Sequence, residues 1–198
     1  MHKKDSQKGI SKNILQITLD EKTHTYSVNG LKLPSVSEIM KTATEEHYAT
    51  IPTSTLEKAA DRGKRVHKSI EMFELYGIEP EDEEVKPYFM QYKIAKHLEQ
   101  FEITECELMM TNGEYCGTID AYAKVKGQET LIDFKVTSII NENLLEIQLA
   151  AYDKLLIHNG RIPMGHYCLQ LKKDGYKFKA IRPNEMLWED FLDKYRAR

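Results

Sequence analysis

The sequence predicts an α/β (α+β) fold in which helices flank a central mixed β-sheet. Its 198 residues, 41% of them hydrophobic and 30% charged, are enough for one globular domain and too few for two of full size. Segments with apolar residues at every second position alternate with segments whose apolar residues recur every three or four positions. In chain order these read as a hairpin, helices, three strands, a helix, two strands and a helix. We expect one domain over residues 1–198, with residues 1–12 as a flexible tail.

The N-terminal half is predicted to hold a hairpin followed by three helices. Residues 14–33 alternate apolar and polar side chains around Asn29-Gly30, a pair typical of hairpin turns. Apolar residues at helical spacing then predict the helices, and Gly77 ends the second of them. Ser35 or Ser37 should cap the first. The expected helices cover residues 38–41, 53–76 and 83–100.

The C-terminal half is predicted to hold five strands and two helices. Asp174-Gly175, between the last two strand segments, is typical of a tight hairpin turn. Gly160 ends the helix that precedes them. The expected strands cover residues 103–110, 115–125, 130–136, 165–172 and 176–181, and the helices cover 141–159 and 183–195.

Charge and composition limit the function. The net charge is −3, which argues against nucleic-acid binding through bulk positive charge, although a bound metal ion could supply positive charge locally. The three cysteines show no CxxC spacing, so we expect no disulfides and no iron–sulfur cluster. The chain lacks an apolar run of the ~20 residues that span a bilayer, and its start lacks a secretory signal. We therefore expect a cytoplasmic protein without a membrane partner.

Charged residues gather on one face of the hairpin predicted over residues 115–136. Because side chains alternate between the faces of a strand, Asp133 and Lys135 share a face. If Gly127-Gln128 forms the turn, Asp120 lies opposite Lys135 and diagonal to Asp133, within ~5–8 Å. A divalent cation could bridge the two carboxylates. An exposed salt-bridged hairpin is the alternative, but the apolar run around Asp133 is typical of a central strand, where Asp is unfavourable.

These residues resemble the PD-(D/E)XK nuclease superfamily, whose pattern is an Asp, a hairpin and (Asp/Glu)-x-Lys. Asp120 and Asp133-Phe134-Lys135 match it, with Asp in place of the commoner Glu. Three further segments resemble its RecB-like exonuclease branch: Gly117-Thr118-Ile119-Asp120, residues 148–152 (QLAAY) and residues 62–67 (RGKRVH). Residues 24–37 resemble phage-type exonucleases and the mitochondrial genome maintenance exonuclease. The resemblance implies a restriction-endonuclease-like αβββαβ core with an N-terminal β-hairpin.

The resemblance also implies a chemistry, which is divalent-metal-dependent hydrolysis of phosphodiester bonds from DNA ends. Mg²⁺ or Mn²⁺ suits a ligand set of carboxylates, a backbone carbonyl and an imidazole. The metal ligands would be Asp120, Asp133, the carbonyl of Phe134 and His67. Lys135 would orient or help to deprotonate the attacking water. Gln148 and Tyr152, four residues apart on one helix face, would position the DNA or orient Lys135.

Other residues are candidates for substrate binding. Basic side chains near His67 are expected to contact backbone phosphates, and these are Arg62, Lys64 and Arg65. Ser35 would bind phosphate as well, unless it only caps a helix. Relatives carry a Glu near the first of the three central strands, and Glu105 and Glu107 are alternatives for it because they share a strand face.

Two other functions stay open. One is a structure-specific endonuclease of the same superfamily, and the other is a catalytically silent DNA-binding protein. The phage-like resemblance suggests a role in prophage recombination or replication, with a single-strand annealing protein as a further partner. Cleavage polarity, strand preference and oligomeric state do not follow from the sequence.

Overall fold

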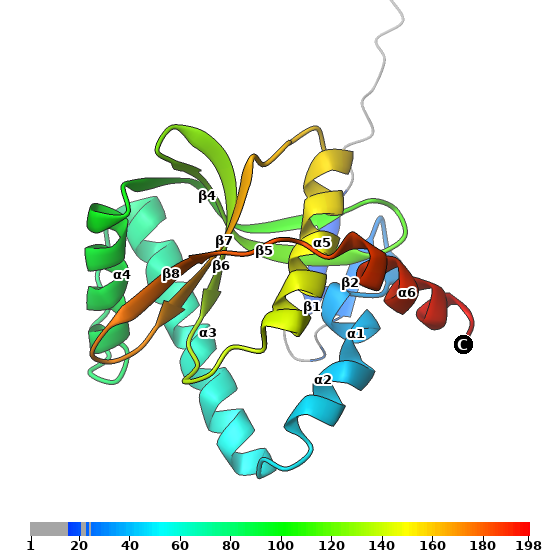
Figure 1. Cartoon of the computed structure of the whole chain (residues 1–198), viewed down its shortest axis with the longest axis horizontal. Coiled ribbons are helices and arrows are strands. Elements are labelled where there is room, and N and C mark those ends of the chain that lie inside the picture. The colour runs from blue at the N-terminus through cyan, green and yellow to red at the C-terminus, as the bar shows by residue number, and fades with distance from the viewer. Residues whose placement is uncertain (1–15, 21–22, 24) are drawn as a thin grey trace, which may run out of the picture.

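The structure is a computed structural model and describes residues 16–20, 23 and 25–198. The tail predicted over residues 1–12 and the start of the predicted hairpin lie outside these residues. The described chain contains a three-stranded sheet of order β1-β2-β3 and a five-stranded sheet of order β4-β5-β6-β7-β8 (Figure 1). The strands are β1 (Ile17–Asp20), β2 (Thr25–Val28), β3 (Leu31–Leu33), β4 (Phe101–Thr111), β5 (Cys116–Val125), β6 (Gln128–Lys135), β7 (Gly165–Leu171) and β8 (Tyr176–Ala180). The helices are α1 (Val36–Ile39), α2 (Lys41–Tyr48), α3 (Thr53–Tyr76), α4 (Lys86–Leu98), α5 (Glu142–His158) and α6 (Glu185–Arg196).

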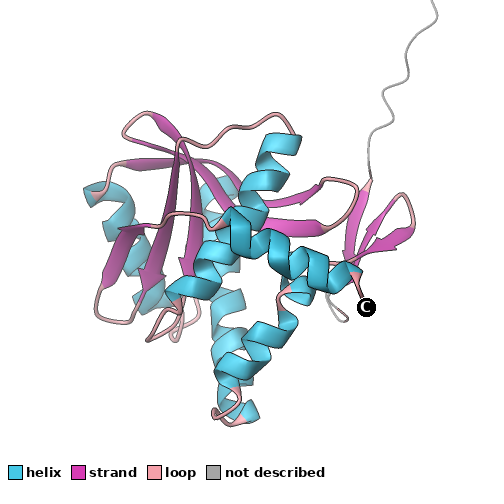
Figure 2. Ribbon diagram, turned by 45° about the vertical axis from the view of Figure 1, so that its right-hand side comes forward, coloured by secondary structure: helices cyan, strands magenta, loops and turns pink. Residues whose placement is uncertain are grey.

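Helices cover both faces of the five-stranded sheet (Figure 2). α3 and α4 pack on one face through a core that includes Val66, Tyr92 and Phe134. α1, α5 and α6 pack on the other through a core that includes Leu149 and Trp188. The sheet is mixed because β6 and β7, which α5 connects, are parallel, whereas the other neighbours are antiparallel. The predicted fold class, a mixed sheet flanked by helices, is confirmed.

The N-terminal sheet packs beside the start of β5. Tyr26 and Val28 form a small core with Cys116, and the Tyr26 hydroxyl lies 2.7 Å from Thr118 Oγ1. The predicted turn at Asn29-Gly30 is present between β2 and β3. The segment forms three strands where the alternation predicted two.

The first two helices differ from the prediction. Ser35 is the cap of α1, because its Oγ accepts a hydrogen bond of 3.0 Å from the backbone N–H of Glu38. α2 was not predicted, and it has no buried residue. A helix without a buried face lacks the apolar periodicity on which the prediction of helices depends.

The turn between β5 and β6 consists of Lys126-Gly127 and not of Gly127-Gln128, as the sequence predicted. Both residues have positive φ, 50° and 83°, as a type I′ two-residue turn requires. The prediction assigned the first turn position to Gly127 because one type of two-residue turn has Gly there. Val125 therefore pairs with Gln128.

This turn moves the predicted register by two residues. The pairing runs only to Ala121 opposite Ile132, so Asp120 has no paired partner on β6, where the prediction had placed Lys135. Because the shift is an even number of residues, each paired side chain keeps its predicted face.

Candidate metal centre

The centre lies where β5 and β6 separate. The backbone pairing of the two strands ends at Ala121 and Ile132. Beyond that pair, the backbone N–H of Phe134 donates a 2.7 Å hydrogen bond to Asp120 Oδ2. The carboxylate of Asp120 therefore takes the place of a strand partner, and its second oxygen is available to groups on α3.

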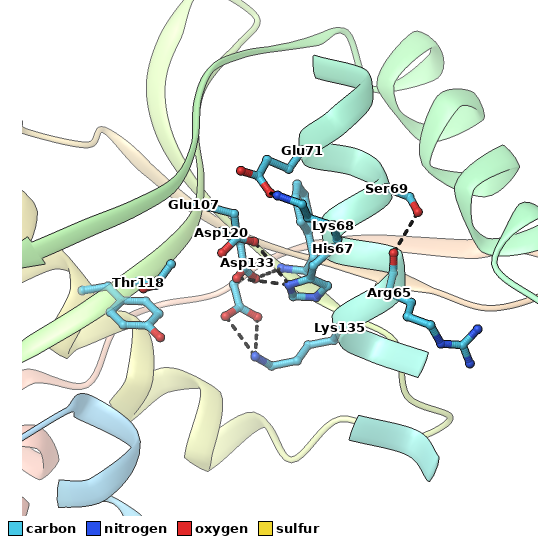
Figure 3. Close-up of polar contacts among 12 residues, drawn as sticks. Arg65, His67, Lys68, Ser69, Glu71, Glu107, Thr118, Asp120, Asp133 and Lys135 are labelled. Carbon is cyan, nitrogen blue, oxygen red and sulfur yellow. Dashed lines mark hydrogen bonds and ion pairs between the residues drawn. The ribbon is translucent and has the colours of Figure 1, made fainter. Parts of the chain in front are cut away.

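α3 brings His67 to this carboxylate. Val66 and Ile70 are fully buried and fix the rotation of the helix against the sheet. His67 Nδ1 lies 3.4 Å from Asp120 Oδ1 and 3.8 Å from Glu107 Oε1 (Figure 3). The imidazole also packs edge-on against the Phe134 ring, with centroids 5.8 Å apart. Contacts on two sides therefore hold the ring in place.

His67, Glu107 and Asp120 form a possible metal-binding group. Each offers a ligand atom, and these atoms all lie within 4.8 Å of one another. A set of two carboxylates and one imidazole suits a small divalent cation. Of the predicted ligands, His67 and Asp120 are in this group, and Asp133 lies beside it. The carbonyl of Phe134 stays a prediction.

The structure separates the two candidate glutamates on β4. Glu105 forms an ion pair with Arg161, which also packs over the Tyr122 ring. Glu107 faces His67. An irregularity in the pairing of β4 with β5 precedes it, and Glu107 itself has φ of 48°. Residue alternation could not distinguish the two, because it predicts the same face for both.

A row of hydrogen bonds links Asp133 to Tyr152. Lys135 Nζ donates to Asp133 Oδ1 at 2.9 Å and to Gln148 Oε1 at 3.1 Å. Gln148 Nε2 in turn donates to the Tyr152 hydroxyl at 3.0 Å. Because an ammonium group only donates, it determines the orientation of the Gln148 amide. The Tyr152 hydroxyl accepts from that amide, and in the part of the chain that the structure describes its own proton has no hydrogen-bond acceptor.

Gly117 allows Tyr152 to reach this row. A β-carbon at position 117 would lie 2.9 Å from Tyr152 Cε1 and 3.1 Å from Leu155 Cδ1. Carbon atoms do not approach so closely without a shift of one of them. Gly117, at the start of the GTID segment, therefore leaves the space that the ring of Tyr152 in the QLAAY segment occupies.

The pKa values of these groups depend on burial and on the charges of their neighbours. Burial lowers the pKa of His67, but the carboxylates of Asp120 and Glu107 outweigh it and raise the pKa to about 9. Burial and repulsion by Asp120 raise the pKa of Glu107 to about 7. Burial also raises the pKa of Asp133 to about 6, against the attraction of Lys135. The pKa of Lys135 is raised despite burial, because Asp133 and Asp120 stabilise its charge.

These charges fit a divalent cation. Three carboxyl groups face two basic side chains, so one negative charge remains uncompensated when every group is ionised. A divalent cation that displaced the His67 proton would balance the three carboxylates together with Lys135. Asp133 is already paired with Lys135, whose Nζ lies 2.7 Å from Oδ2 and 2.9 Å from Oδ1. The cation would therefore be held by the other two carboxylates and the imidazole.

The predicted substrate-binding residues divide into two pairs. Lys64 is exposed and lines a cleft of about 630 Å³ together with His67 and Glu107. Ser35 is 3% exposed and lines a neighbouring hollow of about 170 Å³ beside Asp120 and Tyr152.

The structure does not bring Arg62 and Arg65 to the centre. Figure 3 shows that Arg65 points away from it. Its guanidinium group binds Asp61, Asp82 and Glu84, and Arg62 Nη1 lies 3.9 Å from Glu84. Carboxylates from the loop before α4 therefore form ion pairs with both Arg62 and Arg65. The residues next to the two arginines in the sequence do not reveal this pairing.

Comparisons with known proteins show no family. No family model matches the chain, and no curated protein is significantly similar in sequence. One similar solved structure is a phage-related exonuclease from Haemophilus somnus 129PT, with 13% identity, a TM-score of 0.42, and coverage of 83% of this chain and 91% of the other. Another is SSO0001, with 14% identity, a TM-score of 0.40, and coverage of 79% and 69%. None of the helices among the described residues has the length and apolar character needed to cross a bilayer.

Proposed function

We propose that this protein is a divalent-metal-dependent deoxyribonuclease that hydrolyses phosphodiester bonds from DNA ends. The observation that carries the proposal is the convergence of three carboxyl groups, an imidazole and an ammonium group at the point where β5 and β6 separate. The acidic groups are Glu107, Asp120 and Asp133, and the basic ones are His67 and Lys135.

His67, Glu107 and Asp120 would hold Mg²⁺ or Mn²⁺, which when bound would acidify a water molecule and offset charge on the phosphate. Asp133 keeps Lys135 protonated beside them. As a compact positive charge, Lys135 would donate hydrogen bonds to the attacking water or to a phosphate oxygen. Gln148 holds the ammonium group in place, and the free proton of Tyr152 can be donated to a second phosphate oxygen.

Exonuclease action rests on the motif order in the sequence. The helix that carries His67, the GTID segment and the QLAAY segment follow one another in the chain in the order typical of the RecB-like branch, with His67, Gly117 and Tyr152 around one centre. We propose on the same basis that the protein acts in prophage recombination or replication, beside a single-strand annealing protein.

The experiment is digestion of end-labelled linear DNA by the purified protein with Mg²⁺, with Mn²⁺ and with EDTA. Asp133→Asn and Lys135→Met should each reduce the rate by about a hundredfold or more, because each removes charge from the place where charge develops. Asp174→Asn and Lys173→Met, in the exposed turn between β7 and β8, are the matched controls and should digest DNA as the wild type does.

The same preparation distinguishes the alternatives. A circular single-stranded substrate should stay intact if cleavage starts at ends, and its digestion would indicate an endonuclease. Activity that persists in EDTA, or in both variants of the centre, would contradict the proposed mechanism. Binding of DNA without cleavage under either metal would indicate a silent DNA-binding protein.

A further inference from the structure

A further cavity lies beside Lys135, and His67 is not among its lining residues. It has a volume of about 250 Å³, and Lys135 and Gln148 form part of its wall. Its lining combines apolar and polar residues, and Val36, Met40 and Leu145 on its apolar part belong to the buried core. Among the described residues that line it, none is acidic and Lys135 is the sole cation. It therefore differs in chemistry from the cleft that Lys64, His67, Lys68 and Glu107 line.

The walls of this cavity are tied together by polar contacts that leave its interior open. Gln170 Nε2 donates to the carbonyl oxygens of Thr137 at 2.7 Å and Ser138 at 3.1 Å, which fixes the loop after β6. The Asn141 amide nitrogen lies 2.9 Å from His47 Nδ1, which joins α2 to the start of α5. The cavity is thus formed before any ligand enters.

Two side chains, Ile139 and Tyr48, give the cavity apolar and aromatic surface. Ile139 lines the cavity and yet is 78% exposed, and the half-buried ring of Tyr48 lies on the same cavity from α2. An apolar side chain left in solvent beside an active centre gains stability when a flat apolar group covers it. An aromatic ring offers such a group a stacking surface, whatever its sequence.

We propose that this cavity receives one unpaired nucleobase, that of the nucleotide whose phosphate lies at the metal centre. This inference rests on the proposed function and extends it to the substrate, which must present an unstacked base and therefore a single-stranded or frayed end. Pockets for drug-sized ligands measure roughly 300–1,000 Å³, so a cavity slightly below that range suits a single base. A nucleotide joined to a phosphate at Lys135 must place its base in an adjacent hollow, and the charged cleft suits backbone phosphates better.

The test is binding of short single-stranded oligonucleotides in EDTA, each carrying one abasic site at a different position. For the wild type, one abasic position should weaken binding by about tenfold, because a stacked base is lost there. In Tyr48→Ala, binding of the intact oligonucleotide should weaken by a similar factor, and that position should lose its special effect. Ile139→Ser should act in the same direction. Tyr76→Ala, an exposed tyrosine at the end of α3, is the control and should keep the wild-type profile.

The outcomes separate this inference from the proposed function. Oligonucleotide binding with the same abasic profile in wild type, Tyr48→Ala and Ile139→Ser would overturn the base pocket and leave the nuclease proposal intact. Absence of any DNA binding by the wild type, in EDTA and with Ca²⁺ alike, would overturn both.

Discussion

Lys135 illustrates how its neighbours limit what one residue can do. Its ammonium group lies between Asp133 and Gln148, and the carboxylates raise its pKa. A lysine held in the charged form donates hydrogen bonds and does not accept a proton. The sequence left orientation and deprotonation of water as alternatives, and these surroundings favour orientation.

His67 should contribute directly to metal affinity. Calorimetry of Mn²⁺ binding to His67→Ala should give a dissociation constant at least about tenfold weaker than that of the wild type. Because the pKa of His67 is raised to about 9, Mn²⁺ must displace its proton at pH 7, and the wild type should release more protons than the variant. His97→Ala, an exposed histidine on α4, should match the wild type, and an unchanged affinity in His67→Ala would remove His67 from the ligands.

Lys64 should contribute to DNA binding through charge alone. Lys64→Ala should weaken binding and reduce the slope of log K against log salt by about one, since Lys64 is exposed on the cleft beside His67. Lys58→Ala removes an exposed lysine from the same helix outside that cleft and should change the slope less. Equal slopes for both variants would show that DNA does not follow this cleft.

Sequence reasoning located residues whose position depends on local alternation and did not resolve those that depend on irregular backbone. Asp133 and Lys135 follow from the two-residue repeat of a strand. The choice of Glu107 over Glu105 depends on an irregular stretch of β4, and the position of Arg65 depends on carboxylates of a distant loop. Neither of these is encoded in the neighbouring residues.

At the scale of elements, the centre depends on the close approach of α5 to β5 as much as on the side chains that these two elements contribute to it. Gly117 lies under the Tyr152 ring, and the ring holds its place in the hydrogen-bonded row that ends at Asp133. Gly117 and Tyr152, which are 35 positions apart in the sequence, therefore behave as one unit.

Gly117→Ala should destabilise the protein by about 1–3 kcal/mol through overpacking and lower kcat more than KM, because displacement of Tyr152 disturbs the Gln148 contact with Lys135. When Tyr152→Ala is also present, Gly117→Ala should lose most of its effect on stability and on kcat, since the clash is gone. Chemical unfolding and steady-state DNA digestion of the wild type, the two single variants and the double variant measure these effects. If Gly117→Ala reduced stability and kcat as much in the Tyr152→Ala protein as in the wild type, the glycine would not be needed to make room for Tyr152.

The sequence predicted helices correctly where a buried face imposes a helical spacing of apolar residues. It missed a helix that has no buried face. α3 and α5 have buried faces, and both were predicted close to their observed bounds. α2 has no buried residue, and the turn at Lys126 places a lysine at positive φ, which propensity argues against.

At the scale of the whole molecule, the centre draws on five elements, three consecutive strands and two helices that lie before and after them in the chain. α3, β4, β5, β6 and α5 each contribute at least one side chain, and both layers of helices must be docked for the site to form. Buried charge from all of them is concentrated in one place, so the stability of the metal-free protein should depend on pH.

That dependence has a definite sign. The pKa of His67 is raised from 6.5 to about 9, so its contribution is complete below pH 6.5 and is lost as pH rises through 9. The pKa values of Glu107 and Asp133 are raised from 4.5 and 3.8 to about 7 and 6. The unfolded state therefore loses these protons at lower pH than the folded state does, so stability also falls as pH rises from the unfolded to the folded pKa of each group.

In EDTA, the melting temperature should fall between pH 5.5 and pH 9, and Mg²⁺ or Mn²⁺ should raise it more at pH 8 than at pH 5.5. A His67→Gln/Glu107→Gln double variant lacks two of the titrating groups and should show a flatter profile. If the melting temperature of the metal-free wild type changed with pH in the same way as that of the double variant, the raised pKa values of His67 and Glu107 would be contradicted.

The turn at Lys126-Gly127 makes the centre sensitive to changes far along the hairpin. Exposed turns usually accept added residues, because no packing is disturbed. Here a residue added to the β6 arm and taken into the pairing would shift that strand by one position and turn Asp133 and Lys135 to the opposite face of the sheet. This surface turn should therefore tolerate changes in length poorly, and Gly127, with φ of 83°, should tolerate substitution poorly as well.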